Sequence, residues 1–205
     1  MYTLHHYFLC PCSRFIRICL EEKKFKFKLK IENYWDPNTE YLLMNPAGFS
    51  PILYQDINKY IVGSNVIIEF LDEFKDLQSF FEESKRHEIR RMVNWFEYVF
   101  KKDVIDPILF EKIFKRFEEK KNPDSKKIRN ALENFKFHLS YFEYLIDEND
   151  YLIGEKISYA DLFFASSLSV LDYMGELNFR DFNKVKNLYF KIKSRPSFKN
   201  ILNER

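Results

Sequence analysis

The order of strand and helix patterns in the first 75 residues limits the possible folds more than any other feature of this sequence. Residues 26–31 alternate charged and apolar side chains with a period of two, which predicts a half-exposed strand. From Ser64 onward, apolar residues recur at intervals of three and four, which predicts a helix. The predicted order is strand, helix, strand, short helix, strand, strand and helix, formed by Tyr2–Tyr7, Pro11–Glu22, Lys26–Ile31, Thr39–Met44, Pro51–Tyr54, Tyr60–Val62 and the run that begins at Ser64.

This order is the plan of a thioredoxin-like α/β domain, which we expect over residues 1–75. A charged connector follows at 76–84, and after it apolar residues recur at helical spacing with no convincing strand. We therefore expect an all-helical second domain over 85–205. Within that domain, Asp106-Pro107 is expected to kink or interrupt a helix, because proline lacks the N–H that a helix interior requires.

The clearest helix start in the chain is Ser158-Tyr159-Ala160-Asp161. It has the form of a capping box, with Asp161 in place of the more usual Glu or Gln. Ile157 and Leu162 flank it at positions that allow a hydrophobic staple. The run that follows is apolar on nearly all sides, so we expect the central buried helix of the second domain, with Ser158 and Asp161 as its structural cap.

Charge and hydropathy exclude several classes of partner. The net charge is only +2, from 33 basic and 31 acidic residues that are interleaved, so we expect no nucleic-acid partner. No apolar run approaches the roughly 20 residues that a membrane span requires, and the N-terminus has no secretory signal pattern. Three clustered cysteines do not form a disulfide framework, and no residues have metal-ligand spacing. We expect a cytoplasmic protein.

A cysteine stands at the turn from the first strand to the first helix, in Leu9-Cys10-Pro11-Cys12-Ser13-Arg14. Pro11 suits the first helical position, and the positive end of the helix dipole would favour the Cys10 thiolate. Ser13 occupies the position of a resolving thiol, which excludes dithiol chemistry between those two positions. Cys10 is either a nucleophile that faces a cleft or a small, partly buried residue with an ordinary thiol. Cys12 and Cys19 are expected to face the core.

Several short motifs in a fixed order resemble the soluble glutathione S-transferases. They are Cys-Pro-Cys-Ser, Asn45-Pro46-Ala47-Gly48, Pro51 after a tight turn, Ser64 at a helix start, the Ser158/Asp161 cap and Lys193–Phe198. Other stretches resemble one bacterial subgroup, the FzlA-type proteins that bind the division tubulin homologue FtsZ. Those stretches are Tyr34–Asp36, Glu111–Arg116, Leu171–Glu176 and Arg195–Phe198.

The resemblance implies a glutathione site beside Cys10, which would be the catalytic residue. Pro51 would follow a cis peptide bond, and the backbone of Ser50 would pair with the cysteinyl part of glutathione. Ser64 would offer its hydroxyl and amides to the γ-glutamyl carboxylate, as helix N-termini do for anions. Ser13 would also belong to this glutathione-binding site.

Two positions depart from the family pattern. Gly63 stands where an acidic residue commonly meets the γ-glutamyl ammonium, and Phe49 replaces a polar residue two positions before the proline. Losing one charge-assisted contact typically removes about 1.5–3 kcal/mol of binding free energy. Both residues belong to the predicted glutathione site and weaken it.

Two functions follow from these motifs. The first, which the motif order favours, is a glutathione-dependent transferase or thiol exchanger that uses Cys10, with glutathione as co-substrate. The alternative is a non-catalytic FzlA-type module that binds FtsZ and regulates cell division, with Tyr34 and Trp35 at the interface. A scaffold with neither activity is a third possibility. The resemblance also implies a homodimer.

Overall fold

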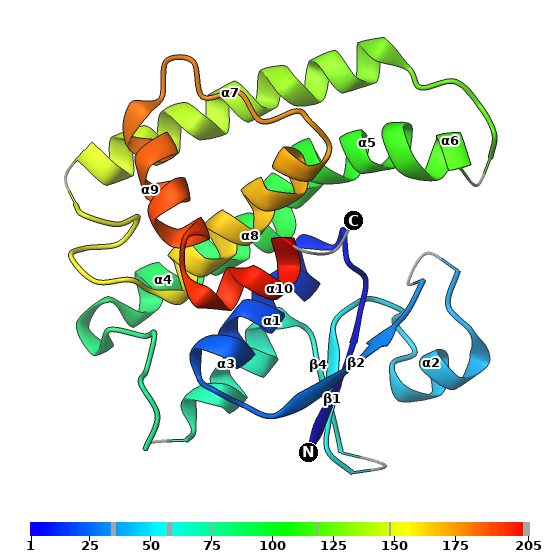
Figure 1. The fold of residues 1–205 in the computed structure, drawn as a ribbon, viewed down its shortest axis with the longest axis vertical. Coiled ribbons are helices and arrows are strands. Elements are labelled where there is room, and N and C mark those ends of the chain that lie inside the picture. The colour runs from blue at the N-terminus through cyan, green and yellow to red at the C-terminus, as the bar shows by residue number, and fades with distance from the viewer. Residues whose placement is uncertain (34–35, 57–58, 75, 118, 148, 203–205) are drawn as a thin grey trace.

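The computed structural model describes residues 1–33, 36–56, 59–74, 76–117, 119–147 and 149–202. Its N-terminal half contains a four-stranded mixed sheet with helices, and its C-terminal half is mostly helical (Figure 1). The predicted fold class, α/β followed by all-α, is therefore confirmed. The N-terminal elements are β1 (Tyr2–His6), α1 (Pro11–Glu22), β2 (Phe27–Ile31), α2 (Thr39–Met44), β3 (Ile52–Tyr54), β4 (Tyr60–Val62) and α3 (Ser64–Asp72).

The strands lie in the order β2-β1-β3-β4. β1 pairs in parallel with β2, with Leu4 opposite Leu29, and antiparallel with β3, where Leu4 lies opposite Leu53. β3 and β4 are antiparallel neighbours. A parallel pair needs a crossover connection, and α1 provides it between β1 and β2. The end of β1 therefore leads directly into the N-terminus of α1, where Cys10 lies.

Helix α1 connects the two halves of the molecule. It packs against α3 on one side and against α8 (Tyr159–Tyr173) on the other. Every residue from Pro11 to Leu20 is buried, although an amphipathic helix would leave one face exposed. The ring of Phe15 stacks on that of Phe163 with centroids 4.3 Å apart. One continuous apolar core therefore runs from the sheet into the helical half.

The C-terminal half is built from helices of very different lengths. A continuous helical segment runs from residue 86 to 117, and α7 lies alongside it (Figure 1). Helix α8 is buried from Tyr159 to Leu171, as predicted for the central helix. The remaining bounds are η1 (Glu83–Lys85), α4 (Arg86–Asn94), η2 (Trp95–Ile105), α5 (Asp106–Leu109), η3 (Phe110–Phe114), α6 (Lys115–Phe117), α7 (Ser125–Asp147), α9 (Asn183–Lys193), η4 (Pro196–Phe198) and α10 (Lys199–Leu202).

Pro107 does not interrupt the helix that contains it, so of the two predicted outcomes, a kink or an interruption, the interruption is wrong. The segments η2 and η3 on its two sides have π-helical hydrogen bonds, and α5 between them is α-helical. Proline removes one N–H donor, and a wider turn can accommodate the ring without ending the helix. The change at Pro107 is therefore one of hydrogen-bond pattern.

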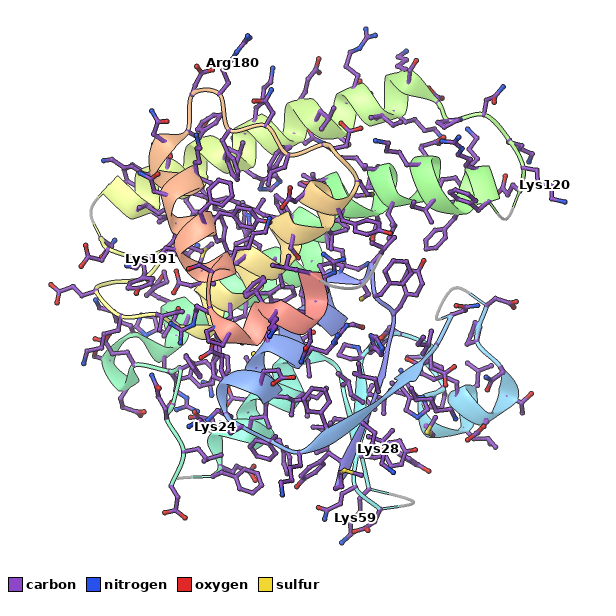
Figure 2. All side chains as sticks on the ribbon, in the orientation of Figure 1. Lys24, Lys28, Lys59, Lys120, Arg180 and Lys191 are labelled. Carbon is purple, nitrogen blue, oxygen red and sulfur yellow. The ribbon has the colours of Figure 1, made fainter. Side chains whose placement is uncertain are left out.

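Charged side chains are distributed over the surface. The labelled basic residues in Figure 2 extend from Arg180 at one end of the molecule to Lys59 at the other, and they come from both halves. Among the residues that the structure describes, no helix is both long enough and apolar enough to cross a membrane. Within the same residues, no cluster of His, Cys, Asp and Glu side chains is suited to hold a metal ion.

Candidate functional site

Cys10 is the N-cap residue of α1, and Pro11 occupies the first turn. Its backbone is extended, with φ −80° and ψ 118°, and its N–H donates to the Tyr7 carbonyl at 3.0 Å. The sulfur therefore lies at the positive end of α1, where the dipole favours negative charge. The side chain is 2% exposed, so the thiol is more buried than the sequence suggested.

The thiol of Cys10 is the most acidic of the three. A hydrogen bond from Cys12 is the main cause, and with the Ser13 amide and the charge of Lys101 it lowers the pKa of Cys10 to about 7 against the effect of burial. The pKa of Cys12 is raised well above its ordinary value, chiefly by its hydrogen bond to Cys10. Burial raises the pKa of Cys19 well above its ordinary value too. A thiol that ionises near neutral pH can act as a nucleophile, and Cys10 is the cysteine of this site that has this property.

Ser13 and Ser50 meet beside Cys10. Their hydroxyls share a hydrogen bond of 2.9 Å, and the Tyr7 amide donates to the Ser13 oxygen at 3.3 Å. The Ser50–Pro51 peptide bond is cis, as the resemblance implied. The structure therefore brings Ser13, Ser50 and Pro51 together at the end of the sheet, next to the N-terminus of α1.

Phe49 lies at the surface, between this loop and the start of α3. Its backbone carbonyl accepts hydrogen bonds from the Tyr41 hydroxyl and from the side-chain amide of Asn45, both at 2.8 Å. Its ring is 51% exposed and lies close to Gly63, because a Cβ on Gly63 would stand 3.6 Å from a ring carbon. Gly63 has φ 88°, which favours glycine there. An apolar ring therefore lies beside the position of the missing acid.

Ser64 is the first residue of α3 and is completely buried. Its hydroxyl makes no hydrogen bond with any group that the structure describes. Glu97 of η2 comes close to Ser64 from the helical half of the molecule. The side-chain amide of Asn65 donates a hydrogen bond to the Glu97 carboxylate. Burial raises the pKa of Glu97, while the backbone N–H of Ser64, the charge of Lys101 and the side chain of Asn65 act in the opposite direction.

Lys101, one helical turn after Glu97, is a second residue from the helical half that the sequence analysis missed. Its ammonium donates to Asp106 at 2.7 Å, and its charge helps to lower the pKa of Cys10. Burial opposes the charge of Lys101, but Asp106 and the two thiols keep its pKa raised. The spacing of Glu97 and Lys101 places them on one helix face, and this signal was readable in the sequence.

Aromatic rings form a wall next to the Cys10 turn. Tyr7 contacts Phe8 and Phe114 with ring centroids 4.9 and 6.2 Å apart, and Phe8 contacts Tyr173 at 6.0 Å. The stretches 111–116 and 171–176 also contact each other, because the Lys112 ammonium donates to the Met174 carbonyl at 2.9 Å. Two of the stretches that carried the subgroup resemblance therefore lie together on this side of the molecule.

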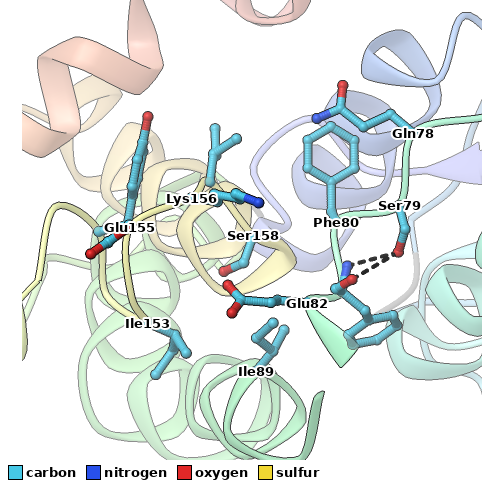
Figure 3. Close-up of a pocket in the computed structure, with 12 residues that line it drawn as sticks. Gln78, Ser79, Phe80, Glu82, Ile89, Ile153, Glu155, Lys156 and Ser158 are labelled. Atoms are coloured by element: carbon cyan, nitrogen blue, oxygen red, sulfur yellow. Dashed lines mark hydrogen bonds between the residues drawn. The ribbon is translucent and has the colours of Figure 1, made fainter. Parts of the chain in front are cut away.

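The two predicted cap residues lie elsewhere, and Tyr34 and Trp35 are outside the described residues. Ser158 and Asp161 form the start of α8, where Asp161 accepts the Ser158 amide at 2.8 Å. Ser158 also lines a cavity of about 420 Å³ between residues 78–82 and 151–158 (Figure 3). None of the predicted glutathione-site residues lines that cavity.

Comparison with known families agrees with this geometry. A model described as the glutathione S-transferase N-terminal domain matches residues 9–73, and one described as the C-terminal domain matches residues 102–205. The thioredoxin-like half, the cis-proline loop and the helical half occur in the same chain and in the expected order. This chain belongs to the glutathione S-transferase family.

Within that family, the chain is similar to FtsZ-localized protein A of Caulobacter vibrioides. The two are 36% identical over 208 residues, which cover 99% of this chain and 91% of the relative. The solved structure of FzlA from C. crescentus matches with a TM-score of 0.94 and 35% identity, over 100% of this chain and 92% of the other. A glutathione S-transferase structure from Rhodospirillum rubrum has a TM-score of 0.92 and 36% identity, over 100% and 93% of the two chains.

Proposed function

We propose that this protein is a non-catalytic, glutathione S-transferase-like module that binds FtsZ and regulates cell division. The observation that carries the proposal is the similarity to FtsZ-localized protein A, which extends over 99% of this chain. An interaction surface that depends on the whole fold needs similarity of that extent. The agreement covers both the α/β half and the helical half.

The geometry of the glutathione-type site supports a binding role. Gly63 carries no acid for an ammonium group, and the ring of Phe49 lies beside it. Glu97 places a carboxylate close to Ser64, where a carboxylate of glutathione would bind. Each of these features disfavours the tripeptide. We propose that Tyr34 and Trp35 take part in the contact with FtsZ.

Co-sedimentation with FtsZ filaments tests this function. We expect the protein to pellet with FtsZ in the presence of GTP, and Trp35→Ala to weaken the interaction at least tenfold, about the 1.4 kcal/mol or more that a buried aromatic anchor contributes. The control is Phe137→Ala on α7, because that ring is 67% exposed in another part of the molecule. Both variants should keep the far-ultraviolet circular dichroism of the parent. A protein that stays in the supernatant with FtsZ filaments contradicts the proposal.

The acidity of Cys10 favours a second candidate function, glutathione-dependent transfer or thiol exchange. In the exchange, the Cys10 thiolate attacks one sulfur of a disulfide, forms a mixed disulfide and releases the other sulfur as a thiolate. The cis-proline loop would present the backbone of Ser50 to the cysteinyl part of glutathione, with Ser13 and Ser64 nearby. This candidate uses the site around Cys10 and leaves open which disulfide or electrophile is the substrate.

A thiolate titration tests that candidate. We expect the ultraviolet absorbance of the protein to show one thiol ionising near pH 7, in line with the pKa of about 7 for Cys10. Cys10→Ala should remove this transition and abolish reduction of glutathione mixed disulfides. Cys12→Ala should move the transition to higher pH, because the hydrogen bond from Cys12 is the main cause of the shift. Cys19→Ala is the control and should change nothing. A transition that remains near the ordinary thiol pKa refutes an activated nucleophile.

We also propose that the chain is a cytoplasmic homodimer with its domains at 1–75 and 85–205 and a linker at 76–84. All three cysteines are free thiols, which suits a reducing compartment. Homodimers are what the resemblance implies, and exposed apolar side chains such as Val66 and Tyr98 occur in both halves. Light scattering measures the mass, and limited proteolysis tests the linker.

A further inference from the structure

We propose that His138 of α7 is an acid-sensitive latch, which holds α7 against η2 while its imidazole is neutral and releases that contact when the imidazole is protonated. Lys101, whose charge acts on Cys10, belongs to the same segment η2. The latch therefore holds a segment that also contributes to the candidate site. It does not depend on FtsZ binding or on a catalytic role for Cys10.

His138 lies at the contact between α7 and η2 and is almost completely buried. The rings of Trp95 and Phe100, both from η2, stand at steep angles to the imidazole, with centroids 5.6 and 5.1 Å away. One turn earlier on α7, the Asn134 side chain donates to the Asp103 backbone carbonyl at 3.3 Å. The imidazole therefore sits among rings, where bulk water cannot solvate a charge.

The hydrogen bond from Trp95 fixes the position of the imidazole proton. The indole N–H lies 3.1 Å from His138 Nδ1, and an indole nitrogen can only donate. Nδ1 must therefore accept, so the neutral imidazole carries its proton on Nε2. Nε2 faces the Asp103 carboxylate at 3.6 Å. The surroundings of both ring nitrogens thus suit one neutral tautomer.

Protonation of His138 would place two donors against each other. Both nitrogens of an imidazolium carry hydrogens, so Nδ1–H would point at the Trp95 N–H, and neither would have an acceptor. A buried donor without a partner costs free energy, and a buried charge costs more. Burial accordingly lowers the pKa of His138, although the charge of Asp103 acts in the opposite direction. Asp103 is 40% exposed, so water weakens its attraction for the imidazolium.

The direction of the pH effect follows from this lowered pKa. Asp103 acts on His138 from η2, while Arg91 of α4 donates to the Tyr141 hydroxyl at 2.8 Å and pairs with Glu88. A pKa that is lower in the folded than in the released state means that release binds a proton. The contribution of His138 is therefore complete at neutral pH and is lost progressively as pH falls below the ordinary 6.5.

NMR of the histidine side chains tests the chemistry of the latch. We expect the ring nitrogen shifts of His138 to show the Nε2–H tautomer at neutral pH, and its titration midpoint to lie below 6.5. Trp95→Phe removes the opposing donor, so the midpoint should rise. Asp103→Asn removes the charge that favours the imidazolium, so the midpoint should fall further. His87→Gln on α4 is the control and should leave the midpoint unchanged, because His87 is 77% exposed.

Amide hydrogen exchange tests the release itself. Between pH 7 and pH 5, the protection factors of α7 amides around His138 should fall in the parent, by up to about tenfold for each pH unit. Those of the central helix α8 should fall less. His138→Gln can still present an oxygen to Trp95 but does not titrate in this range, so it should abolish the fall. His87→Gln should retain it.

Each outcome decides the inference. An Nδ1–H tautomer or a midpoint at or above 6.5 in the parent overturns it, and so does a midpoint that Trp95→Phe leaves unchanged or lowers. Protection of α7 that is constant between pH 7 and pH 5, or that falls equally in His138→Gln, overturns the release. Far-ultraviolet circular dichroism establishes that each variant is folded. The tautomer, the midpoint and the loss of protection in the parent need no variant, so they decide the inference even where a substitution prevents folding.

Discussion

Replacing Asp161 with alanine is expected to lower the free energy of unfolding by about 3–5 kcal/mol. The carboxylate is completely buried and accepts three hydrogen bonds. They come from the Leu152 amide at 2.8 Å, the Ser158 amide at 2.8 Å and the Ser158 hydroxyl at 2.7 Å. Alanine would leave all three donors buried without a partner. Chemical denaturation of the parent and the variant measures the difference.

The control for this variant is Asp181→Ala, because Asp181 is an exposed aspartate of the same half. Its effect should stay within about 0.5 kcal/mol, as for most surface substitutions. A loss below about 1 kcal/mol for Asp161→Ala would contradict the structural role, since a single cap alone is worth about that much.

The effect of Asp161 should also depend on pH. Burial raises the pKa of Asp161 from its ordinary 3.8 to about 6, although the amides of Leu152 and Ser158 oppose the shift. A raised pKa in the folded state means that folding binds protons. The part of this contribution that is linked to protonation is therefore complete below the unfolded-state pKa and is lost as pH rises through about 6, whereas the hydrogen bonds to the carboxyl oxygens remain. The difference between parent and Asp161→Ala should be larger near pH 4 than above pH 7, by roughly 1.4 kcal/mol for each unit of pKa shift.

The second large effect is expected for the ion pair between Glu22 and Arg195, which joins α1 to the C-terminal segment. The two side chains form parallel hydrogen bonds of 2.6 and 2.7 Å, and the Ser197 hydroxyl donates to Glu22 at 2.6 Å. Burial would raise the pKa of Glu22, but the bonds from Arg195 and Ser197 lower it overall. A double-mutant cycle with Glu22→Ala and Arg195→Ala should give a coupling of about 2 kcal/mol, because the pair is bidentate and only partly exposed.

A matched pair on the surface provides the control for this cycle. Lys121 and Glu119 lie 3.0 Å apart, but their side chains are 67% and 41% exposed. Their coupling should stay below about 0.5 kcal/mol, because water and side-chain entropy offset the attraction. Equal couplings for the two pairs would show that the Glu22–Arg195 pair has no special role in joining the halves. The lowered pKa of Glu22 adds a further expectation, namely that its contribution is lost as pH falls through the acidic range.

Much of the fold could be read from local patterns. The alternation in 26–31 predicted β2, which the structure has at Phe27–Ile31, and the spacing after Ser64 predicted α3. Such patterns report which face of an element is buried, and this depends on neighbours in the sequence. The predicted interruption at Pro107 does not occur, because a missing N–H need not end a helix. The helical segment absorbs it through a different hydrogen-bond pattern.

The candidate site, too, could be predicted only in part from local sequence patterns. Cys10 and Pro11 could be assigned to a strand-to-helix turn from their own neighbours, and the structure has Cys10 at the N-cap of α1. Glu97 and Lys101 could not be assigned to the site, because their spacing shows that they share one helix face but not what that face contacts. Lys101 changes the acidity of a thiol 91 positions earlier in the chain. That effect depends on how α1 and the 86–117 helical segment pack across the core.

By itself, the sequence determined the order of the elements, the turn that carries Cys10 and the cap of α8, because each depends on residues that are close in the chain. Only the tertiary structure decided the charge beside Cys10 and the carboxylate close to Ser64. Both depend on side chains that come from the other half of the molecule. Electrostatic effects act through space. A local sequence pattern therefore shows which charged groups are present but not the distances between them in the fold.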